Sequence, residues 1–228
     1  MRYDNIHKGK FLSRPNRFIA NVEIDGKAEV CHVKNTGRCA ELLLPGAPVW
    51  LQRFGADAKR KTKFDLIAVQ KGALLLNIDS QAPNAAAREF LASGGLGWIP
   101  SVLRPEYTWG DSRFDFYLEH GGRRCLAEVK GVTLEEDGTA LFPDAPTLRG
   151  IKHLEGLSRA AAQGFACCVL FVVQFSPAAA FAPNRRTHPA FADALRAARD
   201  AGVRVLAYDC AVTPESMVLR APVPVTGL

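Results

Sequence analysis

Two short segments decide the fold: RFDFYL at residues 113–118 and LAEVK at residues 126–130. Apolar residues alternate with Asp115 in the first segment and with Glu128 and Lys130 in the second, which is the period of a β-strand. The glycine pair at residues 121–122 predicts a turn between the two strands. Because alternate residues share a face, the resulting hairpin would bring Asp115 beside Glu128 and Lys130.

Two carboxylates that meet on one sheet repel each other unless a cation neutralises them. Carboxylate oxygens suit Mg²⁺, which takes one or two of them and keeps several waters. Lys130 would orient or deprotonate a water molecule, or stabilise the charge that develops on a phosphoryl group. The alternative is an exposed strand whose charged side chains form weak ion pairs, and the spacing alone does not exclude it.

The elements around this hairpin predict an α/β domain with a central sheet. They are a helix at 84–93, the hairpin, a helix at 147–163, an apolar strand at 165–174, a helix at 189–201 and a strand at 203–208. Asp-x(12)-Glu-x-Lys in this context is the order expected of PD-(D/E)xK nucleases. Glu89 is a third candidate metal ligand, from the preceding helix. Gln174 is a candidate supporting residue, although it also fits a plain polar strand end.

A basic face is predicted on the helix at 147–163. Arg149, Lys152 and His153 stand at three- and four-residue spacing, so they lie on one side of the helix, for which Thr147 is a suitable N-cap. This face is a candidate contact with a phosphate backbone.

The first third of the chain predicts a small β-barrel. Residues 18–24 alternate between apolar and polar, and the Asp25-Gly26 pair supplies a hairpin turn. Further short strands are expected at residues 28–33, 49–51, 64–69 and 73–78. Their number and length suit an OB-type barrel. We therefore predict two domains, an OB-fold at residues 1–82 and an α/β domain at residues 83–228.

The positive charge of the chain lies almost entirely in the predicted barrel. Residues 1–71 contain 14 Lys and Arg against 7 Asp and Glu, whereas the remainder contains 15 against 16. A basic domain beside a near-neutral one favours a polyanionic partner such as nucleic acid, and a solvated basic face without a ligand is the alternative. The candidate contacts in this domain are Arg14, Arg17, Lys34 and Arg38.

The composition argues against a membrane or secreted protein. No apolar run approaches the roughly 18 to 20 residues of a membrane span. The first eight residues lack the apolar core of a signal peptide, so we expect a cytoplasmic protein with no membrane partner. None of the six cysteines has the spacing of a zinc site, and we expect buried, reduced thiols.

Several motifs follow one another along the chain. They are KNTG at 34–37, LPGA at 44–47, SRFDF at 112–116, EVKGVTL at 128–134, ALFPDA at 140–145, T-x-R-G-x-K-H-L at 147–154, LFVVQ at 170–174 and FAP at 181–183. Together they resemble the sugar fermentation stimulation protein A family, from about residue 8 to about residue 220. The resemblance implies an N-terminal OB-fold, a C-terminal PD-(D/E)xK restriction-endonuclease-like α/β domain, non-specific DNA binding and a regulatory role in sugar (maltose) metabolism.

The resemblance also assigns residues. Asp115, Glu128 and Lys130 fall on the nuclease-like positions of the family, and Arg149, Lys152 and His153 fall on its basic helix motif. One loop departs from the family pattern, because NTGRC stands at residues 35–39 where the family usually has NTGSM. The extra charge of Arg38 would favour contact with phosphate.

Two functions remain open from the sequence. The first is a DNA-binding regulator whose acidic cluster is slow or silent, and the second is a working Mg²⁺-dependent nuclease on DNA or RNA. A sugar-binding protein is a third hypothesis, but no cluster of aromatic and carboxylate residues supports it. The sequence leaves the oligomeric state open, a homodimer included.

Overall fold

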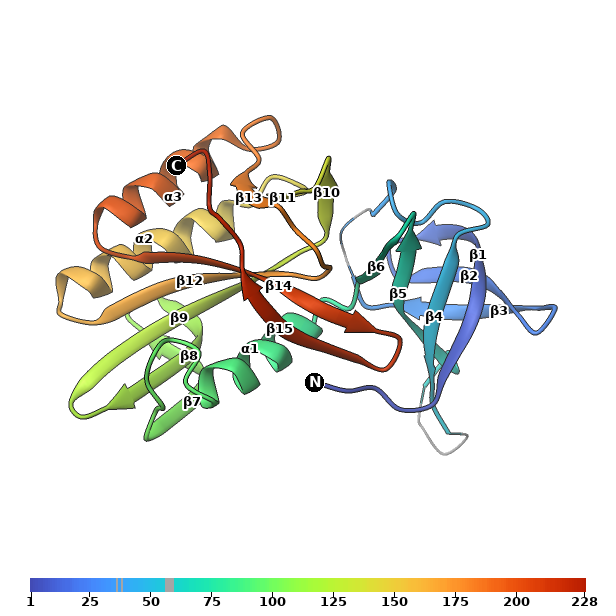
Figure 1. Ribbon diagram of the computed structural model, residues 1–228, viewed down its shortest axis with the longest axis horizontal. Coiled ribbons are helices and arrows are strands. Elements are labelled where there is room, and N and C mark those ends of the chain that lie inside the picture. The colour runs from blue at the N-terminus through green and yellow to red at the C-terminus, as the bar shows by residue number, and fades with distance from the viewer. Residues whose placement is uncertain (36, 38, 56–59) are drawn as a thin grey trace.

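A computed structural model gives the fold, and it describes residues 1–35, 37, 39–55 and 60–228. Figure 1 shows a β-barrel and an α/β domain side by side, joined by the segment between β6 (Leu74–Asn77) and α1 (Ala82–Ala92). The first residues of the chain pack on the α/β domain, because the backbone N–H of Tyr3 donates to the carbonyl of Glu215. The predicted contact Arg38 lies outside the described residues.

Within the described residues, five strands close the barrel in the ring order β1-β2-β3-β5-β4. Their bounds are β1 (Ile6–Asn16), β2 (Ile19–Ile24), β3 (Lys27–Val33), β4 (Pro48–Arg53) and β5 (Phe64–Lys71). The parallel pairing of β3 with β5 completes the ring, which is the arrangement of an OB-fold. The predicted fold class of this domain is confirmed.

Local sequence explains the turn between β2 and β3. Asp25 and Gly26 both have positive φ, at 51° and 76°, as a two-residue type I′ hairpin requires. The long strand β1 was not predicted, because Gly9 and Pro15 interrupt its pattern. Gly9 is needed there, since a Cβ would lie 2.6 Å from Cγ1 of Val22 on the neighbouring strand.

The α/β domain is built on a sheet of order β15-β14-β12-β9-β8-β7. Its strands are β7 (Val102–Trp109), β8 (Ser112–His120), β9 (Arg123–Val132), β12 (Ala166–Val173), β14 (Arg204–Thr213) and β15 (Ser216–Pro222). The almost fully buried strand β12 runs parallel to both β9 and β14, as its continuous apolar sequence predicts. The edge strands β7 and β15 were not predicted.

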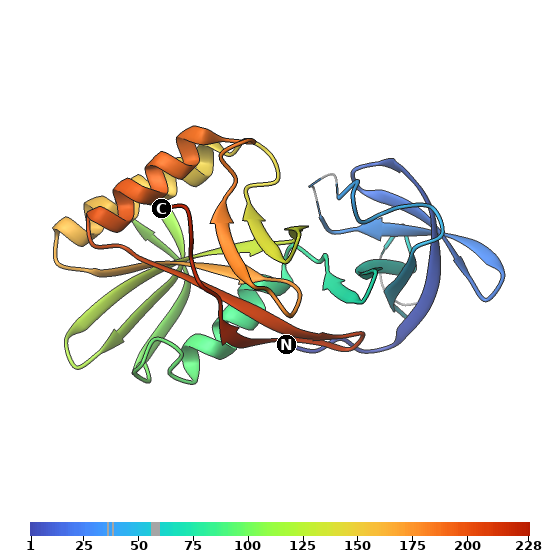
Figure 2. The ribbon, with the colours of Figure 1, turned by 45° about the horizontal axis from the view of Figure 1, so that its top comes forward.

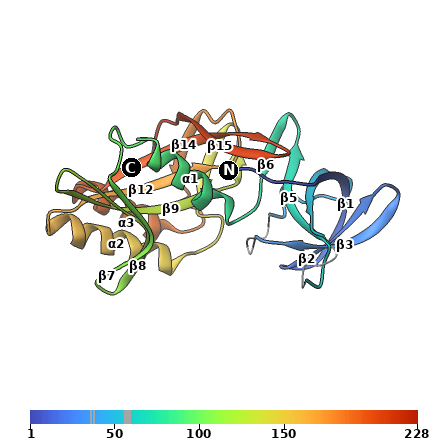
Figure 3. The ribbon, with the colours of Figure 1, turned by 90° about the horizontal axis from the view of Figure 1, so that it is seen from below.

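Helices cover both faces of this sheet. Figure 3 shows α1 on one side and α2 (Leu148–Ala162) and α3 (Pro189–Asp200) on the other. Side chains along β9 point alternately to the two faces of the sheet. Ala127 packs in the hydrophobic cluster that contains α1, and Leu126 packs in the cluster that contains α2 and α3. Glu128 and Lys130 share the α2 face with Leu126.

A small sheet, two of whose strands lie between β9 and α2 in the sequence and the third between β12 and α3, faces the barrel (Figure 2). It comprises β10 (Leu134–Glu136), β11 (Thr139–Phe142) and β13 (Ala180–Pro183). Lys71 of the barrel reaches it, with Nζ 2.5 Å from Oε2 of Glu135 and 2.8 Å from the Glu135 carbonyl oxygen. This sheet was not predicted, and it ties the two domains together.

Two expectations about composition can be compared with the structure. All six cysteines are buried free thiols, as predicted. In the part of the chain that the structure describes, no helix is both long and apolar enough to cross a membrane.

Candidate active site

The predicted cluster forms where β8 and β9 separate. Their ladder begins at the pair Phe116 and Ala127, one residue beyond Asp115. Asp115 continues the connection with its side chain, because Oδ2 accepts a hydrogen bond from the backbone N–H of Val129 at 2.7 Å. Oδ1 of Asp115 accepts from Nδ2 of Asn84, on α1, at 2.8 Å. Asp115 is thereby fixed to the strand that carries the other two residues.

Glu128 is the most enclosed member of the cluster, with 2% of its surface exposed. Its Oε1 accepts from Nζ of Lys130 at 2.6 Å and from Nδ1 of His153 on α2. Its Oε2 is buried and has no hydrogen-bond partner among the described residues. A buried carboxylate oxygen without a partner is costly, so this atom is suited to a positively charged ligand.

His153 is oriented by a second contact. Its Nε2 accepts from Nε of Arg149 at 3.4 Å, which leaves the proton on Nδ1 facing Glu128. His153 was predicted to contact nucleic acid from a helix surface. The structure corrects this prediction, because the imidazole is 7% exposed and points at the carboxylate. Helical spacing placed the residue on the right face, but the burial of that face was not visible in the sequence.

The two carboxylates have pKa values shifted in opposite directions. Burial raises the pKa of Asp115, the charge of Glu128 raises it further, and the hydrogen bonds from Val129 and Asn84 offset only part of this. Burial also opposes ionisation of Glu128, but the hydrogen bond from His153 and the charge of Lys130 outweigh it and lower the pKa of Glu128. The charge of Glu128 thus favours the protonated form of Asp115, and a cation beside both would favour its ionised form.

The residues present fit a divalent cation with few protein ligands. Among the described residues, no group of three or more His, Cys, Asp and Glu is arranged to hold a metal ion. Mg²⁺ needs no such group, since it is usually held by one or two carboxylates, waters and substrate phosphates. Asp115 and the free Oε2 of Glu128 would provide those carboxylates.

Glu89 does not complete the cluster. Its exposed carboxylate binds the amino group of Met1 at 2.6 Å, so the prediction that it is a third metal ligand is wrong. Helix α1 contributes Asn84 instead. Asn84 follows Pro83 at the start of that helix, and nothing in its spacing identified it.

Gln174 supports the domain junction. It is buried, and its Nε2 donates to the carbonyl oxygens of Asn77 at 3.0 Å and Asp79 at 3.3 Å. The backbone N–H of Asn77 in turn donates to the Gln174 carbonyl at 2.9 Å. Gln174 therefore anchors the linker between the domains.

Two of the predicted nucleic-acid contacts are engaged within the protein. Arg14 donates to the carbonyl oxygens of Asn35 at 2.7 Å and Gly37 at 2.8 Å, so it holds the loop after β3. Lys34 lies 2.5 Å from Oδ2 of Asp79 and is mostly buried. Both predictions are corrected, because basic residues that bind the fold look the same in sequence as those that face solvent.

Other basic residues are available on the surface. Arg17 is exposed and its guanidinium lies 4.7 Å from the ring centre of Phe18, which is 44% exposed. On α2, Arg149 and Lys152 are exposed, and Lys152 lies 3.6 Å from a carboxylate oxygen of Asp111. These three cations remain candidates for contact with phosphate.

A basic hollow lies between β4 and β5 of the barrel. Its volume is 340 Å³, and four cationic residues and one aromatic residue dominate its lining: Arg53, Arg60, Lys61, Lys63 and Phe54. The guanidinium of Arg60 stacks 3.9 Å from the ring centre of Phe54. The sequence showed the run of basic residues at 60–63, but it did not show that Arg53 joins them from the neighbouring strand.

Comparisons with known proteins agree along the whole chain. The model of the "Sugar fermentation stimulation protein RE domain" matches residues 81–216, and that of the "SfsA N-terminal OB domain" matches residues 12–78. A sugar fermentation stimulation protein homolog of Desulfitobacterium hafniense (strain DSM 10664 / DCB-2) is 57% identical over 218 residues, covering 95% of this chain and 94% of the relative. A homolog of Clostridium beijerinckii is 50% identical over 220 residues, covering 96% and 97%.

A solved structure shares the same architecture. The structure of Pyrococcus furiosus SfsA in complex with Ca²⁺ superposes with a TM-score of 0.88 at 25% sequence identity, covering 99% of this chain and 98% of that chain. The barrel, the α/β domain and the order of the two are thus those of the family that the motifs resemble. The chain belongs to the sugar fermentation stimulation protein family.

Proposed function

We propose that the protein binds DNA or RNA through basic surfaces on both domains and cleaves it at a Mg²⁺-dependent phosphodiesterase site formed by Asp115, Glu128 and Lys130. The observation that carries this proposal is the buried Oε2 of Glu128, which has no partner among the described residues and lies beside a second carboxylate. The Ca²⁺ complex of the Pyrococcus furiosus relative supports a divalent cation in the family.

Each residue has a distinct role in this proposal. Asp115 and Glu128 hold the ion, which when bound supplies a Lewis acid for a phosphoryl oxygen. His153 fixes Oε1 of Glu128 and so directs Oε2 toward the ion. The side chain of Lys130 is 16% exposed. Its positive charge would stabilise the negative charge that develops on the scissile phosphate.

Nucleic-acid binding at the basic surfaces would rest on charge, without base-specific contacts. The basic hollow of the barrel and Arg17 supply one surface, and Arg149 and Lys152 supply another close to the cluster. Phosphate contacts of this kind position a nucleic acid without reading its sequence. We therefore expect affinity that falls steeply as salt rises.

One observation favours a second candidate, a DNA-binding regulator in sugar (maltose) metabolism with a silent site. Nζ of Lys130 lies only 2.6 Å from Oε1 of Glu128, so part of its charge is neutralised within the cluster. A lysine held in this way would bind without promoting cleavage. The name of the family, which refers to sugar fermentation, agrees with such a role.

One experiment separates the two functions. The full chain is incubated with duplex DNA, single-stranded DNA and RNA, with and without Mg²⁺, beside Glu128→Gln, Lys130→Ala and the exposed control Glu106→Gln. Cleavage that needs Mg²⁺ and is lost in the first two variants supports the nuclease. Binding without cleavage in the unchanged protein supports the regulator, and no binding to any substrate contradicts both.

A further inference from the structure

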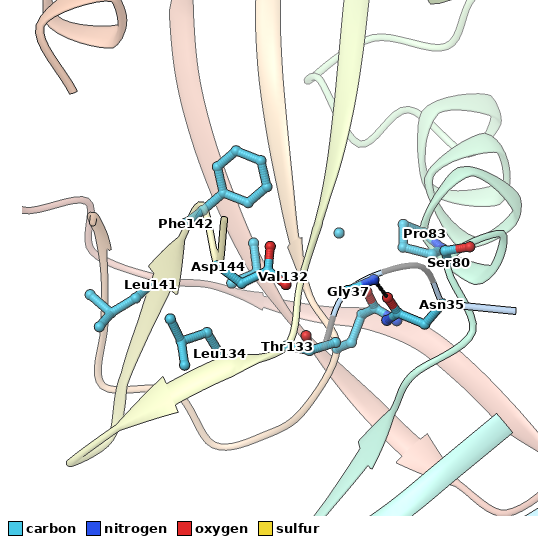
Figure 4. Close-up of a pocket in the computed structure, with 12 residues that line it drawn as sticks. Asn35, Gly37, Ser80, Pro83, Val132, Thr133, Leu134, Leu141, Phe142 and Asp144 are labelled. Carbon is cyan, nitrogen blue, oxygen red and sulfur yellow. Dashed lines mark hydrogen bonds between the residues drawn. The ribbon is translucent and has the colours of Figure 1, made fainter. Parts of the chain in front are cut away.

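A cavity of 180 Å³ lies at the junction of the two domains, beyond the C-terminal end of β9 (Figure 4). Figure 4 shows residues of the β10–β11 hairpin on one side and residues of the barrel loop and the linker on the other. Asn35 and Gly37 come from the barrel, Pro83 from the start of α1, and Leu141 and Asp144 from the small sheet and the loop that follows it. Both domains are needed to form it.

This cavity adjoins the carboxylate cluster along two segments of the chain. Gly131, in its wall, directly follows Lys130, and Pro83 directly precedes Asn84, which binds Asp115. One residue of a strand advances about 3.3 Å, which is less than the length of a nucleotide. A phosphate held at Lys130 and a nucleoside in the cavity would therefore lie at the same end of β9.

Hydrogen-bond acceptors gather in the cavity wall. Oδ2 of Asp144 reaches the barrel loop, since a Cβ on Gly37 would lie 2.7 Å from it. Nε2 of Gln174 donates its hydrogen bonds to the linker. Oε1 of Gln174 would lie 2.5 Å from a Cβ on Gly131. Among the residues that the structure describes, no donor reaches this oxygen of Gln174, a residue that lines the cavity. A ligand with N–H donors would satisfy both groups.

The remaining walls suit a flat ring. Leu141 is partly exposed and offers apolar surface opposite Pro83, whereas the ring of Phe142 packs against Phe171 and Phe191. The volume is below the roughly 300 Å³ at which pockets for drug-sized ligands begin, which suits one heterocycle. Glycine at positions 37 and 131 lets the side chains of Asp144, Gln174 and Pro83 approach the backbone closely.

We propose that this cavity binds one unpaired nucleobase with an exocyclic amine (adenine, cytosine or guanine) from a single-stranded substrate. The assignment rests on the proposed function and specifies its substrate. The amine donates to Asp144 or to Oε1 of Gln174, and the ring packs between Leu141 and Pro83. Thymine and uracil carry a carbonyl oxygen in place of that amine, and their one N–H donor on this edge, N3–H, stands between two carbonyl oxygens that would face the carboxylate unfavourably. A base in a duplex has to leave the stack to enter, at an energetic cost.

The test is equilibrium binding of labelled dA, dC and dT homopolymers and of a duplex to the full chain, without divalent ions to prevent cleavage. We expect dA and dC to bind about tenfold more tightly than dT, the value of one additional hydrogen bond to a charged group. Asp144→Asn should remove this preference, because an amide nitrogen can donate to thymine. Leu141→Trp should fill the cavity and reduce single-strand affinity while duplex affinity stays unchanged. Asp200→Asn, on the exposed end of α3, should behave as the unchanged protein.

Titration of the full chain with free deoxycytidine, monitored by NMR, distinguishes the possible outcomes. Saturable binding that is lost in Leu141→Trp supports the cavity assignment even if no polymer binds, and in that case the proposed function fails alone. Equal affinity for the three homopolymers overturns the assignment while nucleic-acid binding stands. A preference for dC that persists in Asp144→Asn also overturns the assignment. Asn has nearly the same shape as Asp, so this variant keeps the test valid if Leu141→Trp does not fold.

Discussion

Oδ2 of Asp115 accepts a hydrogen bond from the backbone N–H of Val129 at 2.7 Å, just beyond the pair Phe116 and Ala127 at this end of the β8–β9 ladder. A side chain thus replaces a main-chain partner at the point where the strands separate. The contact uses one oxygen of Asp115, and Asn84 uses the other. Oε2 of Glu128 has no partner among the described residues, so in the proposed site it is the residue on which binding of a cation would depend most.

Removal of His153 should destabilise the fold. In His153→Ala, the buried carboxylate of Glu128 keeps only Lys130 as a donor, and we expect a loss of about 2 kcal/mol in the free energy of unfolding. Urea unfolding measures it. Glu155→Ala on the same helix is the control, since Glu155 is exposed and should change stability by less than ~0.5 kcal/mol. Equal stability of the two variants would show that the imidazole does not hold Glu128.

The contact between domains should depend on pH. The hydrogen bond from Lys71 lowers the pKa of Glu135, although burial opposes the shift. A carboxyl whose folded-state pKa is lowered adds stability that is present above its ordinary value of about 4.3 and is lost as pH falls through the folded-state pKa. Glu135→Gln should therefore be less stable than the unchanged protein at neutral pH and equal to it in acid.

Thermal unfolding across the acid range checks this prediction. Glu136→Gln is a matched control, because the carboxylate of Glu136 is more exposed than that of Glu135 and pairs with Arg186 outside the domain contact. A constant difference between Glu135→Gln and the unchanged protein at every pH would mean that the charge of Glu135 contributes nothing.

Arg17 and Lys34 should respond differently to substitution. Arg17→Ala should weaken nucleic-acid binding and reduce the dependence of log affinity on log salt by about 0.9, with stability unchanged. Lys34→Gln should lower stability, because it leaves the buried carboxylate of Asp79 without its cation. Fluorescence anisotropy at several salt concentrations, combined with urea unfolding, separates the two effects. A reduced salt dependence in Lys34→Gln without loss of stability would restore that residue as a phosphate contact.

Gly9 should not tolerate a side chain. A Cβ at this position would lie 2.6 Å from Cγ1 of Val22 and 2.9 Å from the carbonyl oxygen of Glu23. We expect Gly9→Ala to cost roughly 1 to 3 kcal/mol as the barrel strands move apart. Gly55→Ala should be neutral, because nothing described lies within 4 Å of the added carbon. Similar unfolding midpoints for the two variants would contradict the close approach of β1 to β2.

The sequence predicted those parts of the fold that follow from local periodicity. The alternation in β8 and β9 and the apolar run in β12 gave the centre of the sheet, and Asp25-Gly26 gave a barrel turn. The strands that escaped prediction are stabilised by tertiary contacts. The β10–β11 hairpin, for example, is held against the barrel by Lys71 rather than by a hydrophobic pattern of its own.

The candidate site shows the same limit. Asp115, Glu128 and Lys130 were found because strand period and turn position fix their neighbours. The partners of Glu89 and Lys34 come from residues 88 and 45 positions away, and no local rule specifies them. Asn84 was missed for the same reason, since its contact with Asp115 spans 31 residues.

Calorimetric titration of the full chain with Mg²⁺ and with Ca²⁺ tests the central claim most directly. We predict saturable binding to the unchanged protein, loss of that binding in Glu128→Gln and Asp115→Asn, and unchanged binding in the exposed control Glu106→Gln. Binding of equal affinity in Glu128→Gln, or no binding to the unchanged protein, would contradict a divalent-cation site at this cluster.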